Sequence, residues 1–105
     1  MTLMKQKLNS FYNYLQAKNE FANKPIWLTE IGILSIAAYD NQTTVRNQVM
    51  NPLLNYLQNE GGWQKFARVA WFSTRYTAFD ASDLTKSDNS LTVLGARWNT
   101  SSNPY

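Results

Sequence analysis

Two short apolar runs, residues 25–34 and 66–73, constrain most strongly what this chain can fold into. Both have the length of a strand, and both carry apolar side chains at neighbouring as well as alternate positions. That pattern is typical of strands that are buried on both faces, as in a parallel sheet. Glu30 is the only charged residue in the first run, and Gly32, which is expected to let the backbone turn, follows it closely.

Three predicted helices surround the two runs. Residues 2–21 carry a stripe at helical spacing, formed by Met4, Leu8, Phe11 and Leu15. Residues 43–59 carry a second stripe, and residues 91–99 form a short last helix that Asp88 or Ser90 is expected to cap.

Pro52 interrupts the second predicted helix, where a proline costs about 3 kcal/mol. Asn51 and Pro52 together suit a helix start, with Asn as the N-cap and Pro at the first helical position. The segment is therefore predicted to be either two helices or one kinked helix. Gly61 and Gly62 are expected to end it.

The resulting order is helix, strand, helix, strand, helix. Such alternation predicts the α/β class, with parallel strands joined by crossover helices. Two strands make a poor sheet alone, because their faces and edges need cover. The 105 residues are therefore interpreted as a single partial domain whose two strands belong to a larger sheet.

The composition excludes several classes of site. The chain has no Cys and no His, so it has no disulfides, no thiolate nucleophile, no common zinc ligand set and no Ser-His-Asp triad of its own. No metal or cofactor is predicted. The net charge is +3, and the basic residues form no run, which argues against nucleic-acid binding. No apolar stretch reaches the roughly 18 residues of a membrane span.

Glu30 is the residue that most favours chemistry. It lies near the C-terminal end of its strand, where barrel folds build their active sites. Strict alternation places it on one face with Ile26 and Leu28. The alternative is a carboxylate that marks the strand end and points into solvent.

Residues in and after the second run are weaker candidates. Alternation places Trp71 on one face with Val69, where it either lines the same barrel mouth as Glu30 or packs in the core. Arg75 and Tyr76 follow the strand and are expected on a loop near any site. Arg68 needs an ion-pair partner or an exit to solvent, with Asp80, Asp83 and Glu60 as possible partners. Asp80, Asp83 and Asp88 match no calcium loop and are interpreted as a solvated loop.

Three motifs resemble glycoside hydrolase family 128, of the retaining clan of barrel glycosidases. Residues 24–30, KPIWLTE, are similar to the seventh strand of that family. Residues 68–72, RVAWF, resemble its eighth strand, and residues 90–95, SLTVLG, resemble its closing helix. Two positions depart from the family pattern, with Val69 in place of the usual Tyr and Ala67 in place of the usual Glu.

The resemblance implies the C-terminal part of a TIM (β/α)₈ barrel, comprising helix 6, strand 7, helix 7, strand 8 and helix 8. It implies a retaining hydrolase of β-1,3-glucan in which Glu30 is the nucleophile and Trp71 a sugar platform. Arg75 and Tyr76 are the further expected substrate contacts. The resemblance implies a secreted or cell-wall location only for a full-length parent, so the location of this chain stays open.

The second catalytic carboxylate of the family, a Glu on the fourth strand, has no counterpart in this chain. Glu20 and Glu60 are expected at the N-terminal face of the strands, away from the chemistry. The isolated chain is therefore expected to be inactive. Two other functions stay open: a non-catalytic carbohydrate-binding module, and a structural fragment that self-associates to complete a barrel.

Overall fold

The computed structural model describes residues 2–33, 41–76 and 81–101 of the chain. Their helices and strands, in chain order, are α1 (Thr2–Gln16), β1 (Trp27–Ile31), α2 (Gln42–Val45), the π-helical turn η2 (Arg46–Met50), α3 (Asn51–Asn59), α4 (Gly62–Lys65), β2 (Arg68–Trp71) and α5 (Val93–Trp98). The last helix is two residues later at its start and one residue earlier at its end than the sequence predicts, and each strand is shorter than its apolar run.

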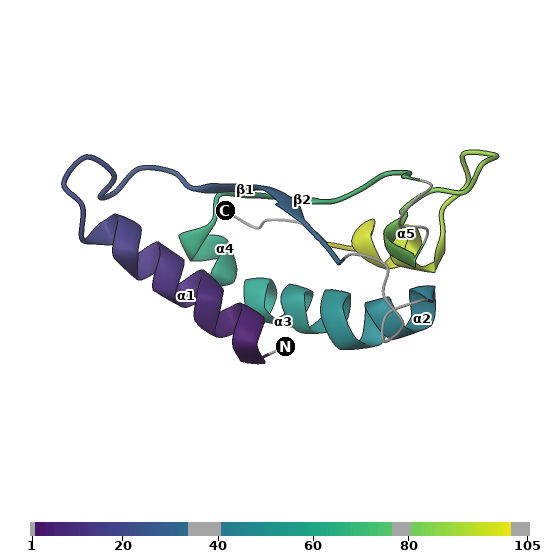
Figure 1. Cartoon of the computed structure of the whole chain (residues 1–105), viewed down its shortest axis with the longest axis horizontal. Helices are drawn as coiled ribbons and strands as arrows, with labels where there is room; N and C mark the ends of the chain where they lie inside the picture. The colour runs from purple at the N-terminus through teal and green to yellow at the C-terminus, as the bar shows by residue number, and fades with distance from the viewer. Residues whose placement is uncertain (1, 34–40, 77–80, 102–105) are drawn as a thin grey trace.

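β1 and β2 pair in parallel, as the sequence predicts, and the helices between them provide the crossover. Figure 1 shows α1, α4 and α3 beneath the two strands, and none of the helices formed by the described residues lies on the opposite, helix-free face of the sheet. The molecule is elongated, at 46 × 27 × 23 Å. Two parallel strands covered on one face are consistent with a part of a (β/α) barrel.

The core lies between the sheet and the helices below it. Its fully buried members come chiefly from η2 and α3, and include Met50, Leu53, Leu54, Tyr56 and Leu57. Strand residues Leu28 and Val69 pack against this cluster from above. Since these residues recur every three or four positions, they form the amphipathic face that the sequence predicts for the second helix.

α1 packs on the same core through a stripe that differs from the predicted one. Met4, Leu8 and Tyr12 contact the core, whereas Phe11 is 46% exposed. The expected stripe Met4, Leu8, Phe11 and Leu15 was therefore wrong at Phe11. The helix also ends at Gln16 rather than Phe21, and turns lead from there to β1.

The segment around Pro52 forms one helical rod rather than two separate helices. Asn51 is itself helical, and its side chain does not cap the start of α3. Its backbone N–H donates to the carbonyl of Arg46, five residues earlier. This wider turn places Pro52 at the start of α3, where its missing N–H has the least effect. The π turn thus resolves the two alternatives that the sequence leaves open.

The ends of the shorter helices follow local rules. Gly61 has φ = 82°, the left-handed conformation that favours glycine after a helix, as predicted. α5 is capped by Thr92, whose hydroxyl accepts the N–H of Gly95 at 3.0 Å, so the expected caps Asp88 and Ser90 were wrong. No helix within the described residues combines the length and apolar character of a bilayer span.

Candidate active site

An irregularity in β1 decides where Glu30 lies. The register pairs Leu28 with Val69 and Ile31 with Trp71, so Thr29 and Glu30 stand opposite the single residue Ala70. Such a bulge re-aims the side chains around it. Leu28 and Ile31 both pack on the helix-covered face, whereas Glu30 is exposed. Strict alternation was therefore wrong in placing Glu30 on the face of Leu28.

The C-terminal ends of the strands form a small open pocket beside Glu30. Its lining consists of Glu30, Gly32, Ile33 and Phe72. A β-carbon at Gly32 would clash with the carbonyl oxygen of Phe72. Gly32 does not take a positive φ, so its function is to allow this close backbone approach rather than the expected turn.

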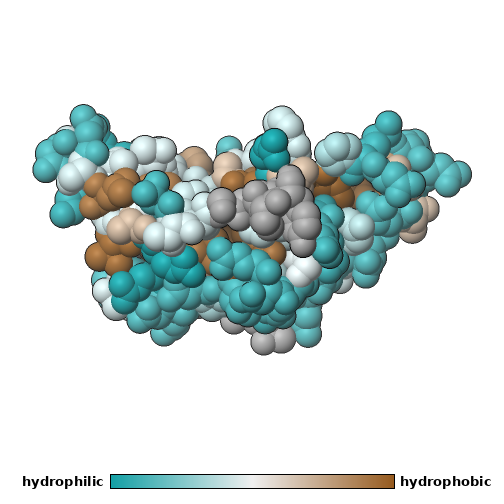
Figure 2. Space-filling model, turned by 180° about the vertical axis from the view of Figure 1, so that it is seen from behind, coloured by the Kyte–Doolittle hydropathy of each residue, from teal (hydrophilic) through white to brown (hydrophobic). Residues whose placement is uncertain are grey.

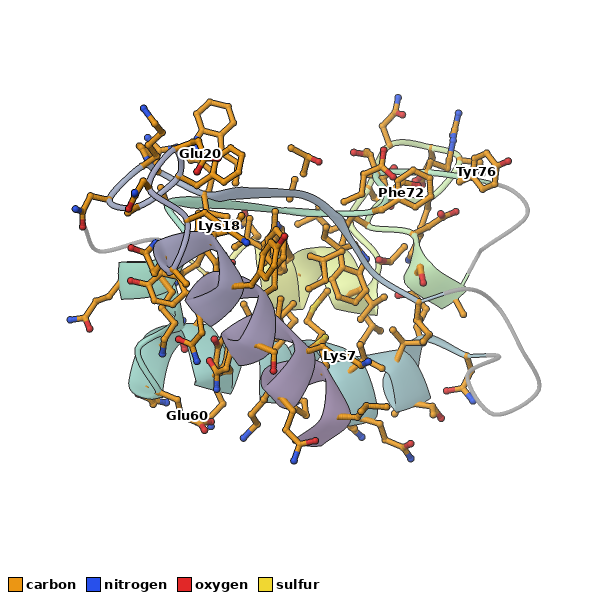
Figure 3. All side chains as sticks on the ribbon, turned by 60° about the vertical axis from the view of Figure 1, so that its left-hand side comes forward. Lys7, Lys18, Glu20, Glu60, Phe72 and Tyr76 are labelled. Carbon is orange, nitrogen blue, oxygen red and sulfur yellow. The ribbon has the colours of Figure 1, made fainter. Side chains whose placement is uncertain are left out.

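Phe72 is the site residue that the sequence analysis missed. Its ring lies 5.8 Å from the ring of Tyr76, tilted by 53°. Figure 3 shows both rings together at one end of the molecule, opposite Glu20 and Lys18. Alternation in β2 carried the signal, because it places Phe72 on the face of Arg68 and Ala70, opposite that of Trp71.

Tyr76 is held at this end by a buried carboxylate. Its backbone N–H donates to Oδ1 of Asp83 at 2.7 Å, and Asp83 is only 6% exposed. The Tyr76 side chain is 48% exposed. The structure therefore brings Tyr76, through Phe72, to the border of the pocket that contains Glu30.

Trp71 lies in the core instead. It is 6% exposed, its indole N–H donates to the carbonyl of Ser82 at 2.8 Å, and its ring contacts Trp98 at 5.8 Å. It shares the helix-covered face with Val69, so it lies on the opposite face of the sheet from Glu30. This geometry favours the core role that the sequence analysis gave as the alternative to a sugar platform.

Arg75 does not line the pocket that contains Glu30. Its guanidinium donates to the carbonyl oxygen of Ser87 at 3.1 Å, and it lines a separate pocket with Lys86 and Thr92. In the same loop, Asp88 accepts the hydroxyl of Ser90 at 2.6 Å, and this bond, followed by a backbone bond from Ser90, lowers the pKa of Asp88. Asp88 is exposed and agrees with the predicted solvated loop. The prediction was wrong for Asp83, which is only 6% exposed and accepts the backbone N–H of Tyr76. Asp80 lies outside the described residues.

Arg68 takes an exit to solvent, which was one of its two predicted outcomes. It is exposed, and its guanidinium donates to the carbonyl of Ala67 at 2.9 Å. Two of its possible partners are engaged elsewhere, Asp83 with Tyr76 and Glu60 with Lys5. Arg68 therefore lies on the helix-free face of the sheet.

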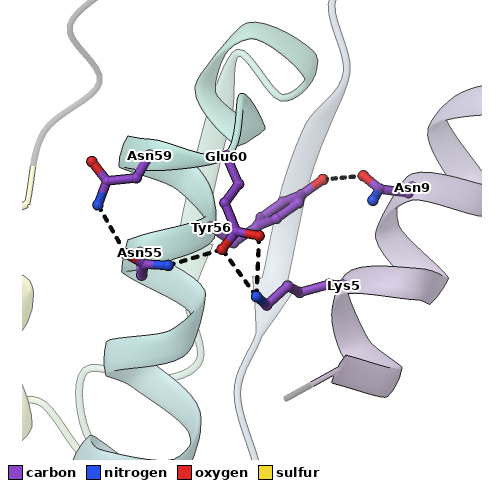
Figure 4. A network of polar contacts seen from close by, with 6 residues as sticks. All are labelled: Lys5, Asn9, Asn55, Tyr56, Asn59 and Glu60. Atoms are coloured by element: carbon purple, nitrogen blue, oxygen red, sulfur yellow. Dashed lines mark hydrogen bonds and ion pairs between the residues drawn. The ribbon is translucent and has the colours of Figure 1, made fainter.

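Glu60 belongs to a polar network between α1 and the end of α3 (Figure 4). Its carboxylate accepts from Nζ of Lys5 at 2.9 Å and from Nδ2 of Asn55 at 2.8 Å. The hydroxyl of Tyr56 donates to Asn9 at 2.7 Å. Burial, with a smaller contribution from the charge of Glu60, raises the pKa of Tyr56. This network joins two helices.

No second carboxylate lines the Glu30 pocket in the part of the chain that is described. Glu20 lies in the turns before β1, towards the opposite end of the strand. The described residues also contain no group of three or more acidic side chains that would hold a metal ion. On these residues, the site provides one carboxylate, an aromatic pair and an open pocket.

Comparisons with known proteins agree on a class. The family described as "Glycosyl hydrolase catalytic core" matches residues 3–98. Among solved structures, the chain is similar to a GH128 (subgroup II) endo-β-1,3-glucanase from Sorangium cellulosum, with 25% sequence identity and a TM-score of 0.61. No curated protein shows a significant match.

The extent of the structural match differs between the two proteins. It covers 90% of this chain and 34% of the Sorangium chain. The present chain thus spans about a third of the length of the enzyme that it resembles. Together, the two findings confirm the predicted resemblance to a glycoside hydrolase family 128 domain.

Proposed function

Because the chain belongs to the glycosyl hydrolase catalytic core family, we propose that it is the C-terminal part of a retaining β-1,3-glucanase in which Glu30 is the nucleophile. One observation carries the proposal. Glu30 leaves the helix-covered face of β1 and opens into a pocket at the C-terminal ends of two parallel strands. Active sites of (β/α)₈ barrels lie at that end of the strands.

The chemistry assigned to Glu30 is that of a carboxylate nucleophile. A retaining glycosidase forms a covalent glycosyl-enzyme intermediate on one carboxylate, while a second carboxyl group about 5–5.5 Å away protonates the leaving oxygen and later activates water. Glu30 is exposed, so it is accessible to an anomeric carbon. Phe72 and Tyr76, at the border of the same pocket, suit the apolar face of a sugar ring.

The substrate class is taken from the Sorangium enzyme, which is described as an endo-β-1,3-glucanase. The acid/base carboxyl group in this proposal comes from another part of a complete barrel, since the described residues place none beside Glu30. We therefore propose that the 105-residue chain alone does not hydrolyse glucan.

A chimera tests the assignment of Glu30 directly. The part of the Sorangium enzyme that this chain does not match would be fused to the chain, and hydrolysis of laminarin would be measured. We expect activity that Glu30→Gln lowers by roughly 10⁴-fold or more, the scale on which loss of a nucleophile acts in other hydrolases. Glu20→Gln, an exposed carboxylate at the other end of the strands, is the matched control and should leave activity within about twofold.

Two outcomes would contradict the proposal. One is a folded and active chimera whose activity survives Glu30→Gln. The other is hydrolysis of laminarin by the isolated chain, lost on Glu30→Gln, which would show that the chain supplies its own acid/base group. Binding of laminarin by the isolated chain without hydrolysis, unchanged by Phe72→Ala, would remove the assigned contact of Phe72 with sugar.

A further inference from the structure

A second pocket lies at the opposite end of the strands from Glu30. It has a volume of about 410 Å³ and forms where the end of α1 leads towards β1 and α4 leads into β2, on the left-hand side of Figure 1. Seen from behind, this end of the molecule lies on the right, and its surface is mostly hydrophilic (Figure 2). Among the described residues, the lining includes three cations, Lys24, Lys65 and Arg68, and no Asp or Glu. We name this the basic pocket.

The three cations form no ion pair within residues 2–33, 41–76 and 81–101. The ammonium of Lys65 lies 6.0 Å and 5.9 Å from the ring centroids of Tyr12 and Tyr56, so aromatic faces rather than a carboxylate hold it. Arg68 donates from Nη1 to the carbonyl of Ala67 at 2.9 Å, which uses one of its five N–H donors. The positive charges are therefore available to a ligand.

Two carboxylates of the neighbouring segments lie outside the basic pocket. Glu60, just before α4, accepts from Lys5 at 2.9 Å and from Asn55 at 2.8 Å, so it belongs to the network in Figure 4. Glu20 lies in the turns before β1 and does not line the pocket. Three positive charges around one concave surface thus produce a positive potential, which attracts a negatively charged ligand.

Trp63 provides an independent observation in the same pocket. It belongs to the lining and is only 7% exposed, and its buried indole N–H has no acceptor in the part of the chain that is described. Buried donors without an acceptor are rare in folded proteins. An oxyanion that reaches the inner wall of the pocket would provide the missing acceptor.

Hydrogen bonds fix the walls of the basic pocket. The N–H of Ala67 donates to the carbonyl of Ile26 at 2.9 Å and joins the starts of the two strands. The N–H of Asn23 donates to Oε1 of Gln16 at 3.2 Å, which ties the turn before β1 to the end of α1. Asn23 has φ = 65°, a left-handed conformation in which Asn is enriched. Because the walls are already fixed, binding loses less conformational entropy.

We propose that the basic pocket binds a phosphate monoester. A phosphate monoester carries a charge of about −1.5 to −2 at neutral pH, which matches several cations better than one carboxylate does. Arg68 can contact two of its oxygens at once, and Lys24 and Lys65 act as point charges.

The size of the basic pocket indicates an ester rather than a free ion. Its volume of about 410 Å³ lies in the range of small-molecule sites, roughly 300–1,000 Å³, and leaves room beyond the phosphate group. Tyr12, Pro25 and Ile26 provide aromatic and apolar surface for the organic part of the ligand. The pocket shares no lining residue with that of Glu30, so the inference does not rest on the proposed function.

Calorimetric titration of the 105-residue chain with glucose 6-phosphate, inorganic phosphate and glucose tests the proposal. We expect glucose 6-phosphate to bind, inorganic phosphate to bind at least about fivefold more weakly because it lacks the organic part, and glucose not to bind. Raising NaCl from about 0.02 M to about 0.2 M should weaken the binding several-fold, since salt screens the attraction between charges. In ¹H–¹⁵N spectra, the indole signal of Trp63, identified by its loss in Trp63→Phe, should shift on binding.

Variants of single lysines locate the binding. Lys65→Met and Lys24→Met should each weaken the binding of glucose 6-phosphate at least about tenfold, because each removes a charge that contacts the phosphate. Lys24 is exposed, so Lys24→Met tests the site even if Lys65→Met does not fold. Lys7→Met is the matched control, because Lys7 is exposed on the N-terminal half of α1, away from the end with Lys18 and Glu20 (Figure 3), and it should change the affinity by no more than about twofold.

Three outcomes would overturn the proposal: no binding of either phosphate compound, glucose that binds as tightly as glucose 6-phosphate, or equal losses of affinity from Lys24→Met and Lys7→Met in chains that circular dichroism shows to be folded. Inorganic phosphate that binds as tightly as the ester would support the pocket as a phosphate site and identify the free ion as its source.

Discussion

The two faces of the β1–β2 sheet differ in what their side chains contact. On the helix-covered face, Leu28 and Val69 pack on residues of η2 and α3 that are almost completely buried, such as Leu53 at 0% exposure. On the opposite, helix-free face, Trp27 is 64% exposed, and the exposed Glu30 lies near the end of the same strand. The helix-covered face is part of the packed core, whereas Trp27, Glu30 and Arg68 are exposed to solvent.

With Glu30 as the proposed nucleophile, this difference places the residues that stabilise the fold and the residue proposed for chemistry on opposite faces of one sheet. The bulge opposite Ala70 is what separates them in β1, because it lets Leu28 and Ile31 stay in the core while Glu30 leaves it. Substitutions on the helix-covered face should therefore change the stability of the fold, and substitutions on the helix-free face should change it little. The following predictions test that division.

The largest expected effect on stability comes from the core. Leu53→Ala should lower the free energy of unfolding by about 2–5 kcal/mol, since it leaves a cavity among fully buried neighbours. Trp27→Ala, although it removes a larger side chain, should change it by no more than about 0.5 kcal/mol. Urea denaturation of the 105-residue chain measures both. A loss at Trp27 as large as that at Leu53 would mean that Trp27 is buried in the 105-residue chain and that the helix-free face is covered.

The covered face is also the part that the sequence predicts best. The apolar runs and the helical stripe reveal the two strands, their parallel order and the core residues of α3. The hydrophobic pattern alone does not reveal the bulge in β1, so strict alternation places Glu30 on the wrong face. It also leaves open the form of the helix at Pro52 and the burial of Trp71. The bulge and the contact of Trp71 with Trp98 depend on segments distant in sequence, whereas the wide turn is a local bond from Asn51 to Arg46.

The site shows the same limit. Glu30 follows from its position at a strand end and from motif resemblance, and Tyr76 from its place after β2. Phe72 was missed although alternation places it opposite Trp71, because alternation alone does not distinguish a pocket face from a core face. Its approach to Gly32 exists only once both strands are paired, whereas its contact with Tyr76 is local in sequence. The prediction that a site lies at the C-terminal ends of the strands depends only on the barrel architecture, and not on any contact between side chains.

Gly32 directly follows β1. Its substitution should lower the free energy of unfolding by less than Leu53→Ala does. A methyl group in Gly32→Ala would clash with the Phe72 carbonyl, so the ends of β1 and β2 must separate. We expect a loss of about 1–3 kcal/mol of stability, as for other overpacked sites. Thr29→Ala, on an exposed position of the same strand, is the control for urea denaturation. An unchanged midpoint for Gly32→Ala would show that the strand ends are not fixed against each other.

The pH dependence of stability tests the packing of Tyr56 between α1 and α3. Its pKa is raised above 10.0 in the folded chain by burial and by Glu60, so the folded state holds the phenolic proton more tightly than the unfolded state does. Stability from this group is fully present below pH 10 and is lost as the pH rises through the folded pKa. At neutral pH, Tyr56→Phe should cost about 1 kcal/mol, because the hydrogen bond to Asn9 is lost.

The measurement for Tyr56 is urea denaturation at pH 8 and at pH values above 10. The wild-type chain should lose more stability over this interval than Tyr56→Phe. Tyr14→Phe, at a tyrosine that is 60% exposed, should retain the wild-type dependence. Equal pH dependence in all three chains would mean that the Tyr56 phenol is not held between α1 and α3.

The smallest effect should come from the ion pair that joins α1 to the end of α3. Lys5 and Glu60 are 2.9 Å apart and about a third exposed, at 31% and 39%, so the pair should contribute about 0.2–1 kcal/mol at low salt. Lys5→Met should lose that amount, and the difference from wild type should vanish in 1 M NaCl, where the screening length is about 3 Å. Lys7→Met, at an exposed lysine on the same helix, is the matched control. A loss that persists in high salt would show that the 2.9 Å contact between Nζ of Lys5 and Glu60 stabilises the chain as a hydrogen bond, which salt does not screen, rather than as a surface ion pair.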